Sequence, residues 1–371
     1  MNCKQHDTPL VTVVVLAYEQ EEYLERCILS VCKQNYTNIE LLICDDGSSN
    51  FSVENTKHFV KQVKKANIVR YEILHNEINL GTVKNCNLAL AHTHGALLKF
   101  LAADDIFADA DVIGDMAVYF SDKAVQVVAG RGVVDSDSSK GKLLPTEIEF
   151  ARLLGASPQQ TYELLCTRPW SAILAPAVMF RTVCLREFRG FDESYRYLED
   201  WPFWVALSKR GIPILHIPRV IVRYGLAGIS TVKNTSTRNY QVRKQYLEEC
   251  RMVLKSEYTA LKEKSRRCRA VQCRLSERCL ARRERMLDCQ MKGSSEVDRT
   301  LLDLPALFYQ KLAGGIGNNR RMPAGLIIAL CIAGGVGIGF RRWCVAGLCM
   351  GIISFCALWN GLLHFLKRTK E

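Results

Sequence analysis

The sequence predicts an α/β protein with a mostly parallel central sheet. From Pro9 onward, short β-branched apolar runs alternate with segments that carry apolar residues at helical spacing. Strands separated by helices of this length pair in parallel and place helices on both faces of their sheet. The 371 residues are 48% hydrophobic and 24% charged, which is typical of a globular protein with a substantial core.

The expected elements follow one another in this order. A strand is predicted over residues 10–18 (LVTVVVLAY), a helix over 21–34, and a buried strand over 39–46 (IELLICDD). The pattern repeats with a helix over 57–66, a strand over 68–74, a helix over 82–93 and a strand over 96–105 (ALLKFLAADD). Ligands of such sheets bind at the carboxyl ends of the strands, beside a change in strand order.

Two of these strands end in paired aspartates, Asp45-Asp46 and Asp104-Asp105. Either pair alone is equally compatible with an ordinary Asx-turn. If both strand ends emerge at one edge of the sheet, the four carboxylates surround one crevice. A divalent cation held there by one or two carboxylates keeps positions open for substrate phosphates. The sequence contains no phosphate-binding loop and no G-x-G-x-x-G turn, which argues against P-loop enzymes and dinucleotide-dependent dehydrogenases.

Charge and hydropathy change toward the C-terminus. The net charge is +12, and residues 241–290 hold 14 Lys and Arg against 7 Asp and Glu. This segment has the pattern of one or two long helices, with a phosphate-bearing or membrane partner as the expectation. A nucleic acid would use the same charge, and a solvated helical connector is a further alternative.

Two apolar segments, residues 322–340 and 343–365, are each long enough to cross a bilayer, with only Arg341 and Arg342 between them. A hairpin would keep the other flanking basic residues in the cytoplasm, whereas one segment would lie in the interface if those two arginines stay inside. We therefore expect a C-terminal anchor that holds the protein at the cytoplasmic face of a membrane, and we favour anionic lipid over nucleic acid as the partner of the basic helices.

The sixteen cysteines are scattered through strand-like and helix-like segments, and the N-terminus lacks the apolar core of a signal peptide. We interpret them as reduced thiols. A zinc site at Cys268, Cys273, Cys279 and Cys289 is disfavoured because no C-x2-C pair and no nearby histidine is present.

The order of three motifs resembles the inverting family 2 glycosyltransferases, including the membrane-anchored enzymes of bacterial surface-polysaccharide synthesis. These motifs are TVVVLAYEQEEYLERCILSVCKQNYTNIELLICDDGSSN, NLGTVKNCNLALAHTHGALLKFLAADD and RGFDESYRYLEDWPFWVAL, within residues 9–231. The resemblance implies a nucleotide-sugar-binding domain of the GT-A type over residues 9–235. It would follow an N-terminal tail (1–8) and precede a basic helical juxtamembrane region (236–321), the two apolar segments (322–366) and a cytosolic tail (367–371).

The resemblance also implies residue roles on the donor side. Ala17 and Tyr18 would end the first strand, with the tyrosine packed on the nucleotide base. Asp46 would accept a hydrogen bond from uracil, supported by Asp45. Further donor-binding positions are Lys84, Asp104, Glu199 and Arg223. Asp105, with Asp104, would hold Mn or Mg at the diphosphate.

On the acceptor side, the resemblance makes Asp200 the general base. Such a transfer needs one carboxylate to remove the proton of the attacking hydroxyl. An alternative is that Asp200 only caps the following helix. Trp170 and Trp201 are the expected acceptor-side aromatics, although Trp170 is equally suited to a core. The sequence departs from the family pattern at Glu19, Ala102 and Gly225, where asparagine, aspartate and histidine are common.

The predicted function is metal-assisted, inverting transfer of a sugar from a nucleotide diphosphate, with UDP favoured and guanosine or thymidine donors left open. The acceptor would be a hydroxyl of a saccharide or lipid-linked saccharide in cell-surface polysaccharide synthesis. Two alternatives are a polyprenyl-phosphate sugar synthase and a non-catalytic membrane-anchored scaffold with a degenerate transferase domain.

Overall fold

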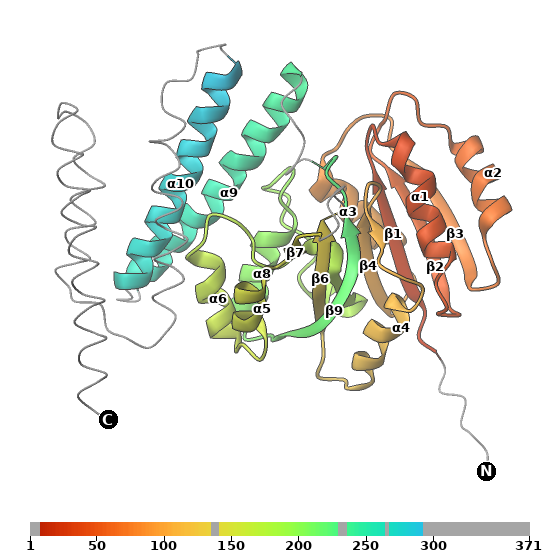
Figure 1. Cartoon of the computed structure of the whole chain (residues 1–371), viewed down its shortest axis with the longest axis horizontal. Helices are drawn as coiled ribbons and strands as arrows, with labels where there is room; N and C mark the ends of the chain where they lie inside the picture. The colour runs from red at the N-terminus through yellow and green to blue at the C-terminus, as the bar shows by residue number, and fades with distance from the viewer. Residues whose placement is uncertain (1–7, 135–140, 229–235, 264–266, 292–371) are drawn as a thin grey trace. The chain divides into compact units, whose positions relative to one another are not determined.

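A mixed sheet of nine strands runs through the described part of the chain, which in this computed structural model comprises residues 8–134, 141–228, 236–263 and 267–291 (Figure 1). The strand order is β3-β2-β1-β4-β8-β6-β9-β5, and β7 pairs with β6. The strands are β1 (Val11–Ala17), β2 (Ile39–Asp45), β3 (Ile68–His75), β4 (Leu97–Ala102), β5 (Ile106–Phe107), β6 (Val127–Val134), β7 (Leu143–Leu144), β8 (Val178–Arg181) and β9 (Ile214–Tyr224).

Ten α-helices are assigned among the described residues. They are α1 (Glu21–Cys32), α2 (Val53–Val63), α3 (Thr82–His92), α4 (Val112–Ala117), α5 (Glu147–Leu153), α6 (Pro158–Cys166), α7 (Thr182–Glu187), α8 (Asp200–Lys209), α9 (Thr237–Glu263) and α10 (Arg267–Met291). The first four predicted strands and the first three predicted helices are confirmed. Helix α2 begins four residues earlier than expected, because the Ser52 side chain accepts a hydrogen bond from the Asn55 N–H and caps it.

Helices cover both faces of the sheet because the strand residues alternate. In β1, Val13 and Val15 join the core that contains Ile28 of α1, whereas Val14 joins the opposite core with Val83 of α3. The expectation of a mostly parallel sheet holds for β1 to β4. The second half is mixed, since β8 pairs antiparallel with both β4 and β6.

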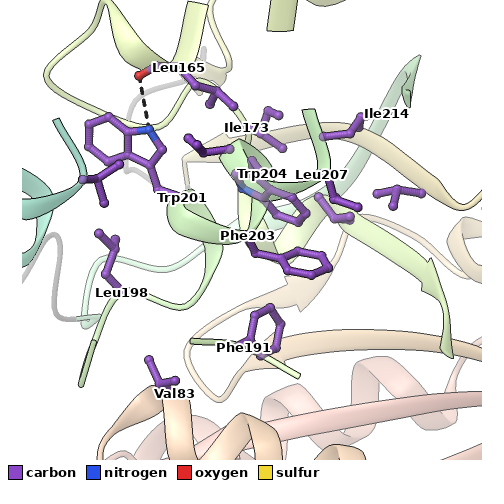
Figure 2. Close-up of a cluster of buried hydrophobic side chains, with 14 of the residues drawn as sticks. Val83, Leu165, Ile173, Phe191, Leu198, Trp201, Phe203, Trp204, Leu207 and Ile214 are labelled. Carbon is purple, nitrogen blue, oxygen red and sulfur yellow. Dashed lines mark hydrogen bonds between the residues drawn. The ribbon is translucent and has the colours of Figure 1, made fainter. Parts of the chain in front are cut away.

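An aromatic cluster lies beneath α8 (Figure 2). Trp204 stacks on Phe180 with ring centroids 5.6 Å apart, and Phe203 meets both rings edge-on. Trp201 is fully buried and donates its indole N–H to the carbonyl of Leu165 over 3.2 Å. The start of α8 therefore rests on a rigid apolar base.

One or two long helices are predicted after the α/β region, and the structure has two, α9 and α10, which pack into the same core. Leu247, Cys250 and Leu254 of α9 are buried within it. Glu257 of α9 accepts hydrogen bonds from the Tyr162 hydroxyl (2.7 Å) and the Lys209 ammonium group (2.5 Å), which ties α9 to α6 and α8.

The predicted membrane segments (322–340 and 343–365) and both predicted tails, apart from residue 8, lie outside the described residues. Among the helices that the structure describes, none is both long and apolar enough to span a bilayer.

Candidate active site

The carboxyl ends of β1, β2 and β4 lie side by side. Ala17 is in register with Asp45 of β2, and Leu16 is in register with Ala102 of β4. β1 therefore lies between β2 and β4. The chain runs from β1 to β2 and β3 on one side and then returns to place β4 on the other side of β1. Ligand sites of such sheets form at a change in strand order of this kind. The expectation that both aspartate pairs emerge at one edge of the sheet is confirmed.

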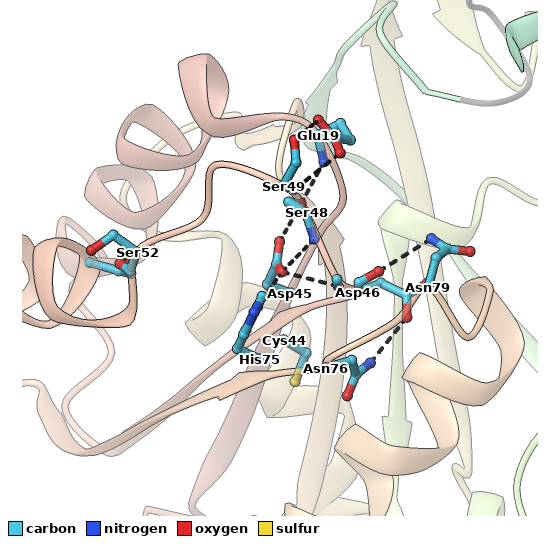
Figure 3. Close-up of polar contacts among 12 residues, drawn as sticks. Glu19, Cys44, Asp45, Asp46, Ser48, Ser49, Ser52, His75, Asn76 and Asn79 are labelled. Atoms are coloured by element: carbon cyan, nitrogen blue, oxygen red, sulfur yellow. Dashed lines mark hydrogen bonds and ion pairs between the residues drawn. The ribbon is translucent and has the colours of Figure 1, made fainter.

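Asp45 holds the turn that follows β2 (Figure 3). One carboxylate accepts hydrogen bonds from the N–H of Gly47 (3.1 Å), the N–H of Ser48 (2.9 Å) and the Ser48 hydroxyl (2.5 Å). Nδ1 of His75 lies 2.8 Å from its Oδ2. Asp45 therefore holds this loop in place, and its part in donor binding stays a prediction.

Asp46 holds a second loop, which connects β3 to α3. Its two oxygens accept hydrogen bonds from the N–H groups of Leu80 and Gly81, each over 2.8 Å, and Oδ1 also accepts from the Asn76 amide over 3.0 Å. The side chain of Asn79 in turn donates to the Asp46 carbonyl (Figure 3). Asp46 is 4% exposed. Its contact with a uracil ring stays a prediction.

Tyr18 and Glu19 follow β1 at this edge. Glu19 adopts a left-handed φ of +52°, a conformation that asparagine tolerates better than glutamate. The Glu19 N–H donates to the Ser48 hydroxyl, and its carboxylate accepts from Ser49. These contacts hold the strained residue that replaces the asparagine common in the family.

Arg238 of α9 lies against Tyr18, a contact that no pattern in the sequence predicts. Its guanidinium carbon is 4.7 Å from the centroid of the Tyr18 ring, and the same group donates to the tyrosine hydroxyl. An ion pair of 3.8 Å joins it to Glu19. A nucleobase that stacks on this face of the ring has to share it with a cation or displace the cation.

Asp104 and Asp105 follow β4, and both contact the segment after β9. The N–H of Gly225 donates to Oδ1 of Asp105 (2.8 Å), and the N–H of Ala227 donates to Oδ2 of Asp104 (2.9 Å). Burial, together with the charge of Asp104, raises the pKa of Asp105 to about 8. The ammonium group of buried Lys99 opposes this shift, and burial lowers the pKa of Lys99 to about 7.

This pair of carboxylates suits a hard divalent cation. Oδ2 of Asp105 is buried and has no hydrogen-bond partner within the described ranges. The residues that the structure describes contain no cluster of three or more His, Cys, Asp and Glu side chains placed to hold a metal. A cation held here by two carboxylates would complete its coordination with donor oxygens and water.

Gly225 takes the place of the histidine that is common in the family, and its surroundings explain this departure. A Cβ atom at Gly225 would lie 2.5 Å from the Asp104 carbonyl oxygen and 2.6 Å from its Oδ2. No side chain fits between this backbone and the acidic pair. Glycine at this position is therefore compatible with the close approach between the segment after β9 and Asp104, whereas a histidine is not.

Glu199 and Asp200 stand where α8 begins. Each keeps part of its surface accessible to solvent, although protein atoms surround it on most sides. Burial raises the pKa of both carboxyl groups, and the neighbouring Asp200 charge adds to the rise at Glu199. The Trp201 N–H donates to Oδ1 of Asp200 over 2.6 Å. Asp200 thus contacts the first turn of the helix and retains exposed surface.

The three acidic elements approach one another through shared neighbours. The buried thiol of Cys86 in α3 has its pKa raised by burial and by the charges of Glu199, Asp46 and Asp200. Burial raises the pKa of the partly buried Tyr246 hydroxyl in α9, and the charges of Cys250 and Asp200 add to the rise. Direct contacts link the same elements. The Asn79 side chain donates to the Asp46 carbonyl, and Asn79 accepts from Arg196, which lies three residues before Glu199. The loop of Asp46 therefore contacts the segment that leads to α8.

The remaining predicted residues are placed as follows. Lys84, in the first turn of α3, and Arg223 of β9 are exposed and make no ion pair with any described residue. Trp170 is partly exposed and donates its indole N–H to Glu149 over 3.0 Å, and the guanidinium groups of Arg168 and Arg283 lie over its ring. Its contact with a sugar stays a prediction. Trp201, the second residue of α8, is fully buried and packs into the core, so it has no exposed surface with which to contact an acceptor.

Comparison with known proteins agrees with this architecture. Residues 12–179 match the family model of glycosyl transferase family 2. The UDP-Glc:alpha-D-GlcNAc-diphosphoundecaprenol beta-1,3-glucosyltransferase WfgD of Escherichia coli is 30% identical over 230 residues, which cover 62% of this chain and 81% of WfgD. An uncharacterized glycosyltransferase of Haemophilus influenzae is 27% identical over 239 residues, which cover 60% of this chain and 67% of that protein.

Among solved structures, TarS of S. aureus aligns with a TM-score of 0.45 and 19% identity, covering 65% of this chain and 39% of TarS. The sequence relationships define the class of protein, a sugar transferase with a mixed α/β domain. The chain belongs to glycosyltransferase family 2, and its fold is of the GT-A type.

The contact between Gly225 and Asp104 predicts a large cost for a methyl group at this position. We expect Gly225→Ala to lower the free energy of unfolding by about 1–3 kcal/mol, because the new Cβ displaces either Asp104 or the backbone that bonds Asp105. Urea unfolding followed by circular dichroism measures the change.

Gly114→Ala is the matched control. Its Cβ would lie 4.0 Å from the nearest atom, in helix α4, so stability should stay equal or rise by roughly 0.5–1 kcal/mol. Equal stability of the two variants would contradict the packing described for Gly225.

Proposed function

We propose that this family 2 enzyme transfers a sugar, with inversion, from a nucleotide-diphosphate donor to a hydroxyl of a saccharide or lipid-linked acceptor in cell-surface polysaccharide synthesis. The observation that carries the proposal is geometric: the aspartate pairs after β2 and β4 share one edge of the sheet, and the segment before Glu199-Asp200 contacts the loop of Asp46 through Asn79. These elements come from sequence positions more than 150 residues apart, and each supplies a group that the reaction needs.

Asp200 is the proposed general base. Its carboxylate takes the proton of the acceptor hydroxyl while that oxygen attacks the anomeric carbon. The bond from the anomeric carbon to the diphosphate oxygen breaks on the opposite face, and the nucleoside diphosphate leaves with the bonding electron pair. Burial raises the pKa of Asp200 above that of an ordinary aspartate, which makes it a stronger base near neutral pH.

On the donor side, Asp104 and Asp105 would hold Mn or Mg, and the unpartnered Oδ2 of Asp105 supports this assignment. A cation bound there acts as a Lewis acid that stabilises charge on the departing diphosphate. Tyr18 offers an aromatic surface for the base, and Asp46 fixes the loop beside it. Lys84 and Arg223 are exposed cations that can approach the diphosphate.

A uridine donor and a lipid-linked acceptor are supported by one relative. The name of WfgD specifies UDP-glucose as its donor and a diphosphoundecaprenol-linked sugar as its acceptor. A membrane site for such an acceptor agrees with the apolar segments at 322–340 and 343–365. We place the enzyme at the cytoplasmic face of a membrane, anchored through its C-terminus, with the exposed arginines of α10, such as Arg278 and Arg285, available to anionic lipid.

Nucleotide binding tests the donor site. We expect the full-length protein to bind UDP in the presence of Mn, and we expect Asp105→Ala or removal of Mn to weaken binding about tenfold or more, since the cation neutralises the diphosphate. Isothermal titration calorimetry measures both effects. If folded protein binds neither UDP nor GDP nor TDP with Mn present, the scaffold alternative is favoured over the enzyme.

Turnover of the donor sugar tests the base. Asp200→Asn should lower kcat by roughly 10²–10⁴-fold and leave UDP affinity nearly unchanged, because the amide cannot accept the proton. In the wild type, kcat should fall as the pH drops through the raised pKa of Asp200, at a higher pH than for an unperturbed aspartate. Only mild loss in Asp200→Asn would favour an acceptor that arrives ionised, such as a polyprenyl phosphate.

Vesicle flotation tests the anchor. The full chain should float with vesicles that contain anionic phospholipid, in low and high salt alike, because apolar insertion is insensitive to screening. A chain that ends at residue 321 should bind only in low salt, through its basic helices. Full activity of that shorter chain on soluble acceptors, together with no flotation of the full chain, would overturn the membrane assignment.

A further inference from the structure

One buried carboxylate of α9 holds the backbone that leads to the proposed base. Glu249 is 4% exposed. Its Oε1 accepts a hydrogen bond from the N–H of Arg196 (3.0 Å), and its Oε2 accepts from the N–H groups of Tyr197 (2.9 Å) and Leu198 (3.0 Å). These three residues directly precede Glu199 and Asp200.

The contact matters energetically because this segment has no regular secondary structure. Its N–H groups have no ladder or helix to satisfy them, and each one left buried without a partner would cost about 1–3 kcal/mol. A charged acceptor makes stronger hydrogen bonds than a neutral one. Glu249 thus stabilises this backbone conformation by accepting the hydrogen bonds of its N–H groups.

The same segment is held from the opposite side by the donor loop. The Arg196 guanidinium donates to the carbonyl and the side-chain oxygen of Asn79, over 2.9 and 2.7 Å, and the Arg196 carbonyl accepts from the N–H of Val83 over 3.1 Å. Asn79 in turn bonds the backbone of Asp46. Residues 196–198 therefore lie between Glu249 and the loop that Asp46 organises.

Asp200 has limited freedom relative to this segment. Leu198 is buried, and Asp200 is the first residue of α8, so only Glu199 lies between residues 196–198 and the proposed base. A shift of residues 196–198 would be transmitted to the carboxylates of Glu199 and Asp200, since only their own two backbone units separate them from it. A displacement of about 1 Å at a reacting group can cost on the order of 10²-fold in rate.

We propose that Glu249 is a positioning residue of the transfer reaction, which sets the place of the Asp200 carboxylate by binding the N–H groups of residues 196–198. The proposal rests on the proposed role of Asp200. It makes α9, which lies outside the matched family region of residues 12–179, a part of the active site.

The test compares Glu249→Gln and Glu249→Asp with wild type in the full-length protein. Titration with UDP in the presence of Mn gives the fraction of protein molecules that bind nucleotide. The rate of UDP release from a UDP-sugar, divided by that fraction, gives kcat for each binding-competent site. Water serves as the acceptor if no saccharide is at hand. We expect kcat of Glu249→Gln to fall about 10–100-fold, with the Kd for UDP within threefold of wild type. Glu249→Asp keeps the charge and should recover part of the rate.

Glu248→Gln is the matched control, because Glu248 is the exposed neighbour on the same helix and should leave kcat unchanged. A purely structural role for Glu249 predicts a lower melting temperature and fewer competent sites, with kcat for each remaining site preserved. A kcat within threefold of wild type in Glu249→Gln would overturn the proposal.

A second readout separates this proposal from the proposed function. Amide hydrogen exchange should show residues 196–200 protected in the wild type and at least tenfold faster in Glu249→Gln, with the strands of the sheet unchanged. If wild type neither binds UDP nor releases it, the proposed function fails whatever the exchange shows. If wild type is active but exchange and kcat do not respond to Glu249→Gln, the positioning role fails alone.

Discussion

Buried backbone N–H groups that lack a secondary-structure partner need an acceptor, and the site in this protein is built on that requirement. The segments that follow β2 and β3, and the segment before α8, have no regular secondary structure. Three buried carboxylates serve them, Asp45 at residues 47–48, Asp46 at residues 80–81 and Glu249 at residues 196–198. Each carboxylate thereby supplies the acceptors that these irregular segments lack.

The remaining acids differ from these three in what their oxygens contact. Asp105 has one oxygen without a partner among the described residues, and Asp200 keeps exposed surface at the start of α8. Burial raises the pKa of both, because too few hydrogen bonds offset the loss of water. Spare acceptor capacity together with a raised pKa is the combination expected of groups that meet a cation or a proton during a reaction. The fold thus separates carboxylates that hold loops from carboxylates that remain available.

Much of the first half of the fold could be predicted, because period-2 and period-3.6 patterns alternate there without interruption. The antiparallel strand β8 was missed, since its four residues directly follow a short proline-containing helical turn (residues 175–177) and carry no turn signal of a hairpin. The aspartates could be found because they sit at strand ends. Glu249 could not, because nothing in a mixed-charge helix distinguishes it from the exposed Glu248 beside it. Its partners lie about fifty residues away and are backbone groups, which leave no trace in residue type.

This last point bears on where the catalytic unit ends. A boundary near residue 235 follows from the change of pattern in the sequence, and the family match stops earlier still, at residue 179. Yet Glu249 and Glu257 of α9 satisfy groups of the loop before α8, of α6 and of α8 itself, and Cys273 of α10 donates to the Leu254 carbonyl in the same interface. Removing α9 would take away the shared acceptor of three N–H groups before α8 and uncover the core that Leu247, Cys250 and Leu254 help to fill. Within the described residues, α9 and α10 therefore pack as a further layer on the core of the transferase domain.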